Sequence, residues 1–175
     1  MTDLFHILLL EVVTKPKTPY SSGSEHTIYP NNHDSTKLFK VVTNDPIRGL
    51  KDNWIEIFKK YPKYFPTIYR SNDKGAEVEK LDTNKSDKEF DVFYDDTETE
   101  FYDLLDLIVS KKNYKPLLKY CTNIITQLSP EMIPAFKRWI KLAKGISSIP
   151  MNLRPDIHKN NFGYDKKGNL KMIDI

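Results

Sequence analysis

Apolar residues follow two spacings along this chain, and the change from one to the other divides the sequence. In the first half, short runs rich in β-branched and aromatic residues lie between turn residues, a pattern typical of strands. Four runs predict short strands: Thr27–Pro30, Lys37–Thr43, Phe65–Tyr69 and Ala76–Leu81. Turn residues at Asn31–Asp34 and Ser71–Gly75 predict that the strands pair as two hairpins.

Helical spacing appears once in the first half and dominates the second. Asp45 and Pro46 are typical of a helix start, and Pro62 marks its expected end. Three more helices are expected, the first opened by a capping box at Thr97–Glu100 and the third by Ser129–Glu131 with a stop near Gly145. The predicted apolar faces contain Leu50, Trp54, Ile57, Phe58 and Tyr61; Phe101, Leu104, Leu105 and Ile108; Leu117, Leu118, Cys121, Ile124, Ile125 and Leu128; and Phe136, Trp139, Ile140 and Leu142.

This order predicts an α+β protein with a small, mainly antiparallel sheet. We expect a strand-rich part with one helix over residues 1–82 and a helical part over residues 83–175. The charged stretch Asp82–Glu89 reads as a loop or linker between them. The apolar stretch Leu4–Val13 is too short to span a bilayer and is expected to be a buried strand or short helix.

Composition excludes several classes of protein. The 175 residues are 39% hydrophobic and 29% charged, which is typical of a globular domain. The net charge is only +3 and the lysines are interspersed with acids, so we expect neither nucleic-acid nor membrane binding. The single cysteine, Cys121, allows no intrachain disulfide and favours a reducing, cytoplasmic compartment. Heavy use of Lys, Asn, Ile, Tyr and Asp is typical of an AT-rich genome and favours a phage, a virus or a low-GC bacterium. If the protein is phage-encoded, the expected location is the host cytoplasm or the virion.

The most specific pattern lies at the end of the chain. Asp156 is followed five residues later by Asn161, and thirteen residues further on by Asp174. Between the last two, the turn pair Gly168-Asn169 leads into a short apolar run, which predicts a hairpin. The spacing resembles the catalytic core of protein-kinase-like phosphotransferases, in which a catalytic-loop Asp, an Asn and the Asp of the D-F-G motif surround one phosphoryl group.

The resemblance implies a bilobal kinase-like fold that binds Mg-ATP between its lobes. It implies that Asp156 accepts the proton of a hydroxyl acceptor, and that Asn161 and Asp174 are the Mg²⁺ ligands. His158, two residues after the Asp, resembles the Asp-x-His pattern of aminoglycoside and choline phosphotransferases. It is a candidate for contacting the transferred phosphate, and a structural hydrogen bond within the loop is an equally good interpretation.

Earlier residues match the same resemblance by their order. Lys40 resembles the strand lysine that contacts the nucleotide phosphates, and Glu56 resembles its helical ion-pair partner. Gly23 lies in a segment similar to a glycine-rich loop, although that family pattern has three glycines and this segment has one. Glu79 to Leu81 resemble the hinge, whose backbone would pair with the adenine. Taken alone, Lys40 and Glu56 are equally well explained as solvent-facing surface residues.

Two departures bear on function. Arg154-Pro155 replaces the His-Arg of the protein-kinase loop, and the chain ends one residue after Asp174. The helices that follow in protein kinases are then missing. We expect the reduced large lobe to be covered by the N-terminal segment, a partner chain or a homo-oligomer, or to remain minimal. Three functions follow: an atypical kinase acting on a hydroxyl of a protein or small molecule, a kinase-fold regulatory or structural module without turnover, and an unrelated α+β interaction domain.

Overall fold

The computed structural model divides the chain into two compact units, Met1–Lys80 and Leu81–Ile175. It describes residues 19, 21–22, 26–42, 54–72, 74–97, 100–110, 114–150 and 157–174. The architecture is α+β with an antiparallel sheet and several helices, as the sequence predicted. The apolar stretch Leu4–Val13 lies outside the described residues. No helix among those described is long and apolar enough to cross a membrane.

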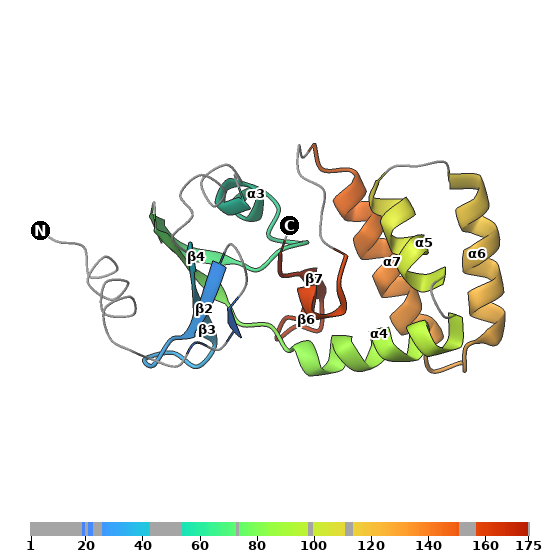
Figure 1. Ribbon diagram of the computed structural model, residues 1–175, viewed down its shortest axis with the longest axis horizontal. Coiled ribbons are helices and arrows are strands. Elements are labelled where there is room, and N and C mark those ends of the chain that lie inside the picture. Colours follow the sequence, from blue (N-terminus) through green and yellow to red (C-terminus); the bar gives the residue numbers. More distant parts are fainter. Residues whose placement is uncertain are drawn as a thin grey trace, which may run out of the picture. The chain divides into compact units, whose positions relative to one another are not determined.

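The first unit contains a five-stranded antiparallel sheet (Figure 1). Its strands follow the order β1-β2-β3-β5-β4. The hairpin turn between β2 and β3 is fixed by Asn31, whose side-chain oxygen accepts hydrogen bonds from the backbone N–H groups of His33 and Asp34 at 2.9 and 3.2 Å. The strand bounds are Ser21–Ser22 (β1), His26–Pro30 (β2), Lys37–Val42 (β3), Ile68–Asn72 (β4) and Gly75–Glu79 (β5).

The second hairpin differs from its prediction. Strand β4 begins three residues later than expected and continues through Asn72, so the predicted turn at Ser71–Gly75 is shorter. Asn72 closes this turn by accepting a hydrogen bond from the Lys74 N–H at 2.9 Å. Position 75 requires glycine, because a Cβ there would lie 2.3 Å from the Lys40 carbonyl oxygen on the paired strand. The tight turn and the glycine together bring β5 close to β3.

One described helix of the first unit, α3 (Trp54–Lys60), carries the aromatic core of that unit. Trp54 and Phe58 are buried on it, and the Phe58 ring stacks on Phe65 with 4.7 Å between centroids. The Trp54 and Phe58 rings meet edge to face at 5.3 Å. The helix ends before Pro62, as predicted, and its predicted beginning near Pro46 lies outside the described residues.

The second unit contains four described helices and a two-stranded sheet (Figure 1). Its core is aromatic at the centre, with Phe90, Phe93 and Phe101 meeting Phe136 and Trp139 from α7. The predicted apolar faces of α5 and α7 are buried, whereas on α6 Leu117, Ile124 and Leu128 are buried and Cys121 and Ile125 are half-buried. The bounds are Thr83–Thr97 (α4), Glu100–Val109 (α5), Tyr114–Gln127 (α6), Ile133–Ser147 (α7), Lys159–Asn161 (the 3₁₀ turn η1), Phe162–Tyr164 (β6) and Leu170–Met172 (β7).

The stretch Asp82–Glu89 is helical, and the prediction of a loop was wrong. Asp82 accepts a hydrogen bond from the Asn84 N–H at 3.0 Å at the start of α4. Ser86 and Glu89 are buried although both are polar. With Phe90 and Phe93 they form one face at helical spacing. The helical period of this face was missed in the sequence, because a search for apolar residues alone does not count Ser86 and Glu89.

Helix α7 also differs at both ends. It begins at Ile133 rather than at Ser129, and its N-cap Met132 provides no side-chain hydrogen bond. It continues through Gly145 to Ser147. Ile146 and Ser147 are buried, so they extend the packed face of the helix beyond Gly145. Burial therefore outweighs the local preference of Gly145 to end a helix.

Candidate active site

The β6–β7 hairpin brings two of the predicted site residues together. Phe162 pairs with Met172, and one step beyond the strands the Ile173 N–H donates a 2.7 Å hydrogen bond to the Asn161 carbonyl oxygen. Asn161 therefore lies opposite Ile173, immediately beside Asp174. Both predicted metal ligands are half-buried. The thirteen-residue spacing read from the sequence corresponds to the two ends of one hairpin.

The turn of this hairpin is organised by Asp165. Its carboxylate accepts hydrogen bonds from the backbone N–H groups of Lys167 and Asn169 at 2.9 and 2.8 Å and from the Asn169 side chain at 2.9 Å. Lys171, buried on β7, lies 3.6 Å away. Burial alone would raise the pKa of Asp165, but the hydrogen bonds from Asn169 and Lys167 outweigh it and lower that pKa. Gly168 has φ +78°, which explains the glycine in this turn.

His158 begins the short turn that precedes β6. Its ring nitrogen Nδ1 accepts a hydrogen bond from the Asn160 N–H at 3.4 Å, and its carbonyl oxygen accepts one from the Asn161 N–H at 2.8 Å. These hydrogen bonds agree with the structural interpretation of His158, because they cap the turn that holds Asn161. Its side chain is exposed, and its expected contact with a transferred phosphate stays a prediction.

Two acids of α4 lie beside this turn, and the sequence analysis missed both. Lys159 forms an ion pair with Asp91 at 3.0 Å, which joins η1 to α4. Asp87, one helical turn earlier, has a buried Oδ1 atom without a hydrogen-bond partner in the described part of the chain. Burial raises the pKa of Asp87; the positive charge of Lys159 opposes this effect and the negative charge of Asp91 adds to it. The i, i+4 spacing of Asp87 and Asp91 was the available signal, and the mistaken loop assignment concealed it.

The other side of the hairpin is held against the segment that enters α4. Tyr164 and Asp82 exchange two backbone hydrogen bonds of 2.9 Å, forming an isolated antiparallel bridge. Gly163 permits this approach, because a Cβ there would lie 2.6 Å from the Leu81 Cβ. Ser86 adds a hydrogen bond of 2.8 Å from its hydroxyl to the Phe162 carbonyl oxygen. Strand β6 is thus fixed to Leu81–Ser86 by backbone contacts as well as by side chains.

A buried polar network lies under the hairpin. Glu89 accepts hydrogen bonds from Trp139 Nε1 at 3.0 Å, from Arg138 Nη2 at 3.2 Å and from the Tyr164 hydroxyl. Burial and the hydrogen bond to Glu89 raise the pKa of Tyr164 to about 12, so its hydroxyl stays protonated at neutral pH. Glu89 lies on α4, its donors Arg138 and Trp139 lie on α7, and Tyr164 lies on β6. The buried network therefore connects these three elements.

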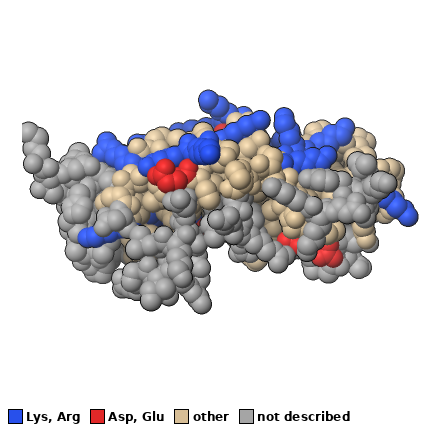
Figure 2. Space-filling view, turned by 90° about the horizontal axis from the view of Figure 1, so that it is seen from above, with Lys and Arg blue, Asp and Glu red and all other residues tan. Residues whose placement is uncertain are grey.

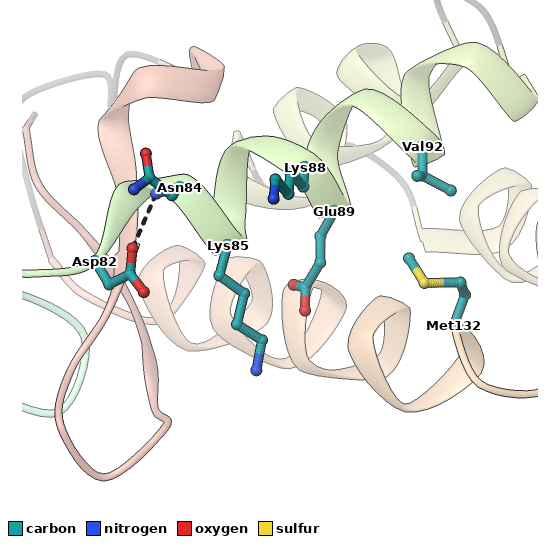
Figure 3. A pocket seen from close by; sticks show the side chains of 7 residues that line it. All are labelled: Asp82, Asn84, Lys85, Lys88, Glu89, Val92 and Met132. Atoms are coloured by element: carbon teal, nitrogen blue, oxygen red, sulfur yellow. Dashed lines mark hydrogen bonds between the residues drawn. The ribbon is translucent and has the colours of Figure 1, made fainter.

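Glu89 also lines an open groove of about 440 Å³ along α4 (Figure 3). Lys85 and Glu89 extend from α4 on the same side, and Val92 faces Met132 at the far end. The Lys85 ammonium lies 4.5 Å from the centre of the Tyr164 ring. Since Glu89 is already engaged by Arg138, Trp139 and Tyr164, the groove's buried acid serves the hairpin rather than an incoming ligand.

In the first unit, Lys40 is buried in the middle of β3, between β2 and β5. Only 2% of the residue is exposed. Its ammonium lies 4.7 Å from the centre of the Trp54 ring and 5.6 Å from that of Phe58. The surface interpretation of Lys40 is excluded by this burial.

Glu56 has a different described partner from the one predicted. It lies on the exposed side of α3, where its carboxylate is 3.4 Å from Lys59 and its side chain is 65% exposed. The described contacts of Glu56 do not include Lys40. Trp54 and Phe58, each two residues from Glu56, face the buried side of α3, and their rings lie near the lysine instead.

The predicted hinge residues use part of their backbone within the protein. The Glu79 N–H donates to the Thr67 carbonyl oxygen, and the Lys80 N–H donates to that of Thr36, both at 2.9 Å. The Glu79 carboxylate accepts two hydrogen bonds of 3.1 Å from Thr67. Leu81 is buried, so the expected adenine contact at these positions stays a prediction.

Asp156 and Gly23 lie outside the described residues, so the roles expected for them stay predictions. Among the residues described, no group of three or more His, Cys, Asp or Glu side chains could hold a metal ion. Asn161 and Asp174 offer an amide and a carboxylate oxygen. Such a sparse oxygen set fits Mg²⁺, which keeps several waters and is usually bound by one or two carboxylates together with substrate phosphates.

Comparison with protein-family models finds no match, and comparison with curated proteins finds none. Two solved structures are similar over 99% of this chain. They are a gentamicin complex of APH(2")-IIa, with 14% identity and a TM-score of 0.40 over 70% of that chain, and a streptomycin–ATP ternary complex of APH(2")-IIa, with 12% identity and a TM-score of 0.37 over 72%. Both TM-scores are below 0.5, so neither likeness assigns this chain a fold or an activity.

Proposed function

We propose that this chain is an atypical kinase that transfers the γ-phosphoryl group of Mg-ATP to a hydroxyl of a protein or small molecule. The observation that carries the proposal is the 2.7 Å hydrogen bond from the Ile173 N–H to the Asn161 carbonyl oxygen. It places the backbones of Asn161 and Asp174 close together at the ends of the hairpin, which supports a metal ion shared by their side-chain oxygens.

Each site residue has a distinct task in this proposal. Asn161 and Asp174 hold Mg²⁺, and His158 keeps Asn161 in place through the hydrogen bonds of η1. A bound ion would supply charge neutralisation for the phosphates. Asp156 accepts the proton of the acceptor hydroxyl, and its position five residues before Asn161 makes it part of the same loop. Catalysis then depends on positioning and charge neutralisation rather than on a covalent intermediate.

Lys40 supplies the phosphate-binding cation. Its burial among aromatic rings restricts the side chain and removes part of its hydration, which strengthens its attraction for an anion. In this proposal the Trp54 and Phe58 rings restrain the ammonium, and Gly23, Glu79 and Leu81 complete the nucleotide contacts.

The second candidate is a kinase-fold regulatory or structural module without turnover. One observation favours it: Glu56 pairs with Lys59 on the exposed side of α3, whereas an active kinase of this type uses the acid to hold the strand lysine. The two candidates differ in turnover and agree in nucleotide binding, so a transfer assay separates them.

The transfer assay uses ATP labelled in its γ-phosphate and a panel of hydroxyl acceptors: Ser, Thr and Tyr peptides, aminoglycosides and choline. We expect label transfer by the wild-type chain and a loss of about 100-fold or more in Asp156→Asn, because that change removes the proton acceptor. Asp103→Asn, an exposed change on α5, is the matched control and should retain activity.

Retention of full activity by Asp156→Asn would contradict the proposed base. Magnesium-dependent ATP binding without transfer to any acceptor of the panel would favour the module. Absence of both binding and transfer would leave an unrelated α+β interaction domain as the better description.

A further inference from the structure

A second groove, about 390 Å³ in volume, lies between α6 and α7 in the second unit, apart from the hairpin residues described above. Its floor is apolar and is formed by Cys121 and Ile125 from α6 and by Phe136 and Ile140 from α7. Three lysines complete its lining, all of them on α7: Lys137, Lys141 and Lys144. The groove therefore combines an uncharged floor with a positively charged rim.

The three lysines form a stripe along α7. Their spacing of four and then three residues places them on one face of the helix, over about 10.5 Å at a rise of about 1.5 Å per residue. All three are exposed, and no ion pair joins any of them to an acid within the described ranges. Like charges at this spacing repel one another, so the isolated face carries an unfavourable interaction that an acidic partner would relieve.

The distribution of charge on the second unit supports this interpretation. In the half of Figure 2 that contains α5 to α7, basic side chains gather along one edge and acidic side chains lie towards the opposite edge. Charge on the described part of this face is therefore segregated, which would favour a partner of opposite charge along the basic edge.

The shape of the floor indicates what kind of partner fits. Phe136 and Ile140 are recessed, with 1% and 9% of their surfaces exposed. Burial raises the pKa of the Cys121 thiol, although Lys144 opposes this, so the thiol is neutral at physiological pH and behaves as an apolar surface. A recessed apolar floor accepts protruding side chains from a partner. A membrane-inserting surface instead needs apolar side chains that protrude from the protein.

We propose that the α6–α7 groove binds an acidic amphipathic helix of a partner protein. The partner's apolar side chains would enter the floor between Ile125 and Ile140, and carboxylates at the i, i+4 and i+7 positions would pair with the lysine stripe. The groove lining shares no residue with the proposed phosphotransfer site, and this proposal does not depend on that site.

The test measures binding of a fluorescently labelled designed peptide to the full chain by fluorescence anisotropy. The peptide is helical, with three Glu residues at the i, i+4, i+7 spacing and Leu residues along the adjacent face. A scrambled peptide of the same composition is the reference. We expect the designed peptide to bind at least about tenfold more tightly than the scrambled one, with affinity falling as salt is raised.

Charge reversal of the stripe, Lys137→Glu with Lys141→Glu and Lys144→Glu, should weaken binding about tenfold or more. The charge-matched control is Lys119→Glu with Lys166→Glu and Lys167→Glu, three exposed lysines outside the groove lining, and it should stay within about twofold of wild type. Circular dichroism melts confirm that both variants are folded.

A second pair of variants tests the floor while leaving the lysines unchanged. Ile125→Glu places a charge on the groove floor and should abolish the preference for the designed peptide, whereas Thr126→Glu, on the exposed neighbouring position, should retain it.

Equal binding of the designed and scrambled peptides would overturn the proposal, as would unchanged binding after reversal of the stripe. Lysine-dependent binding to vesicles containing phosphatidylserine in place of the peptide would overturn it in favour of a membrane surface. Lysine-dependent self-association in sedimentation velocity, without peptide binding, would overturn it in favour of a second copy of this chain.

Discussion

Two regions of this chain hold predicted site residues in opposite ways. In the first unit, the Lys40 ammonium is buried and lies over the rings of Trp54 and Phe58. In the second, Asn161 and Asp174 are half-buried, and backbone hydrogen bonds of the hairpin fix their positions. The cation is restrained by packing, whereas strand register restrains the backbone that carries the two oxygen-bearing side chains.

The difference separates stability from ligand binding. A change near Lys40 removes core packing and therefore acts first on the free energy of unfolding. A change at Asn161 or Asp174 leaves the backbone pairing of β6 and β7 intact, so in the proposed function it should act first on the binding of the ion. Between these extremes lies the Glu89 network, which supports the hairpin from a buried position.

The largest expected effect is on the free energy of unfolding and comes from the aromatic core around Lys40. Phe58→Ala removes a ring that is 0% exposed and stacked on Phe65. It should lower the free energy of unfolding by about 3–5 kcal/mol, measured by urea denaturation. Tyr69→Ala, at a ring that is 45% exposed, is the control and should cost less than about 1 kcal/mol. Similar losses in the two variants would show that α3 does not anchor this sheet.

The Glu89 network should rank second. Glu89→Ala leaves Arg138, Trp139 and Tyr164 without their buried acceptor and should lower the free energy of unfolding by about 2–4 kcal/mol. Glu89→Gln retains an acceptor oxygen and should cost less than Glu89→Ala does. Urea denaturation of both variants measures the difference, and an Ala variant as stable as wild type would rule out a supporting role for the network.

Gly163→Ala should have an intermediate effect on the hairpin itself. The added methyl group would lie 2.6 Å from the Leu81 Cβ, so strand β6 or the segment before α4 must shift. We expect a loss of about 1–3 kcal/mol in thermal or urea unfolding. Gly168→Ala separates steric contact from backbone strain, because no atom lies within 4 Å of its added methyl and only its positive φ opposes the change. If Gly163→Ala were neutral, the close approach of the hairpin to Leu81 would not constrain it.

The smallest expected effect concerns pH. Because the folded-state pKa of Asp165 is lowered, its carboxylate stabilises the protein above the unfolded-state pKa of about 4. That stability is lost as pH falls through the folded-state value. Asp165→Asn should therefore reduce stability by roughly 1 kcal/mol at neutral pH and by less near pH 2. Parallel pH profiles of wild type and variant would contradict this assignment.

Local spacing predicted the hairpin better than it predicted the long-range contacts. The Gly168-Asn169 turn and the short strands set one register, so the adjacency of Asn161 and Asp174 follows from residues within fifteen positions of one another. The burial of Lys40 depends on α3 and on β5, which are distant in sequence, and its alternation in β3 did not reveal which face is covered.

Two errors have the same origin. Glu56 was assigned to the lysine from its position in the helix, but the face of α3 that is buried is decided by Trp54 and Phe58. Helix α4 was missed because its buried face includes Ser86 and Glu89, whose hydrogen bonds to Phe162, Trp139 and Tyr164 make burial favourable only in the folded chain. The spacing of residues in the sequence does not reveal such long-range hydrogen-bond partners.

The most direct test of the central claim is isothermal titration calorimetry of ATP with and without Mg²⁺, on wild type, Asp174→Asn and the exposed control Asp103→Asn. If Asn161 and Asp174 hold the ion, Mg²⁺ should tighten ATP binding in wild type and in Asp103→Asn, and Asp174→Asn should lose about tenfold or more of that gain. An Asp174→Asn chain that binds Mg-ATP as tightly as wild type, with the same dependence on Mg²⁺, would contradict the account.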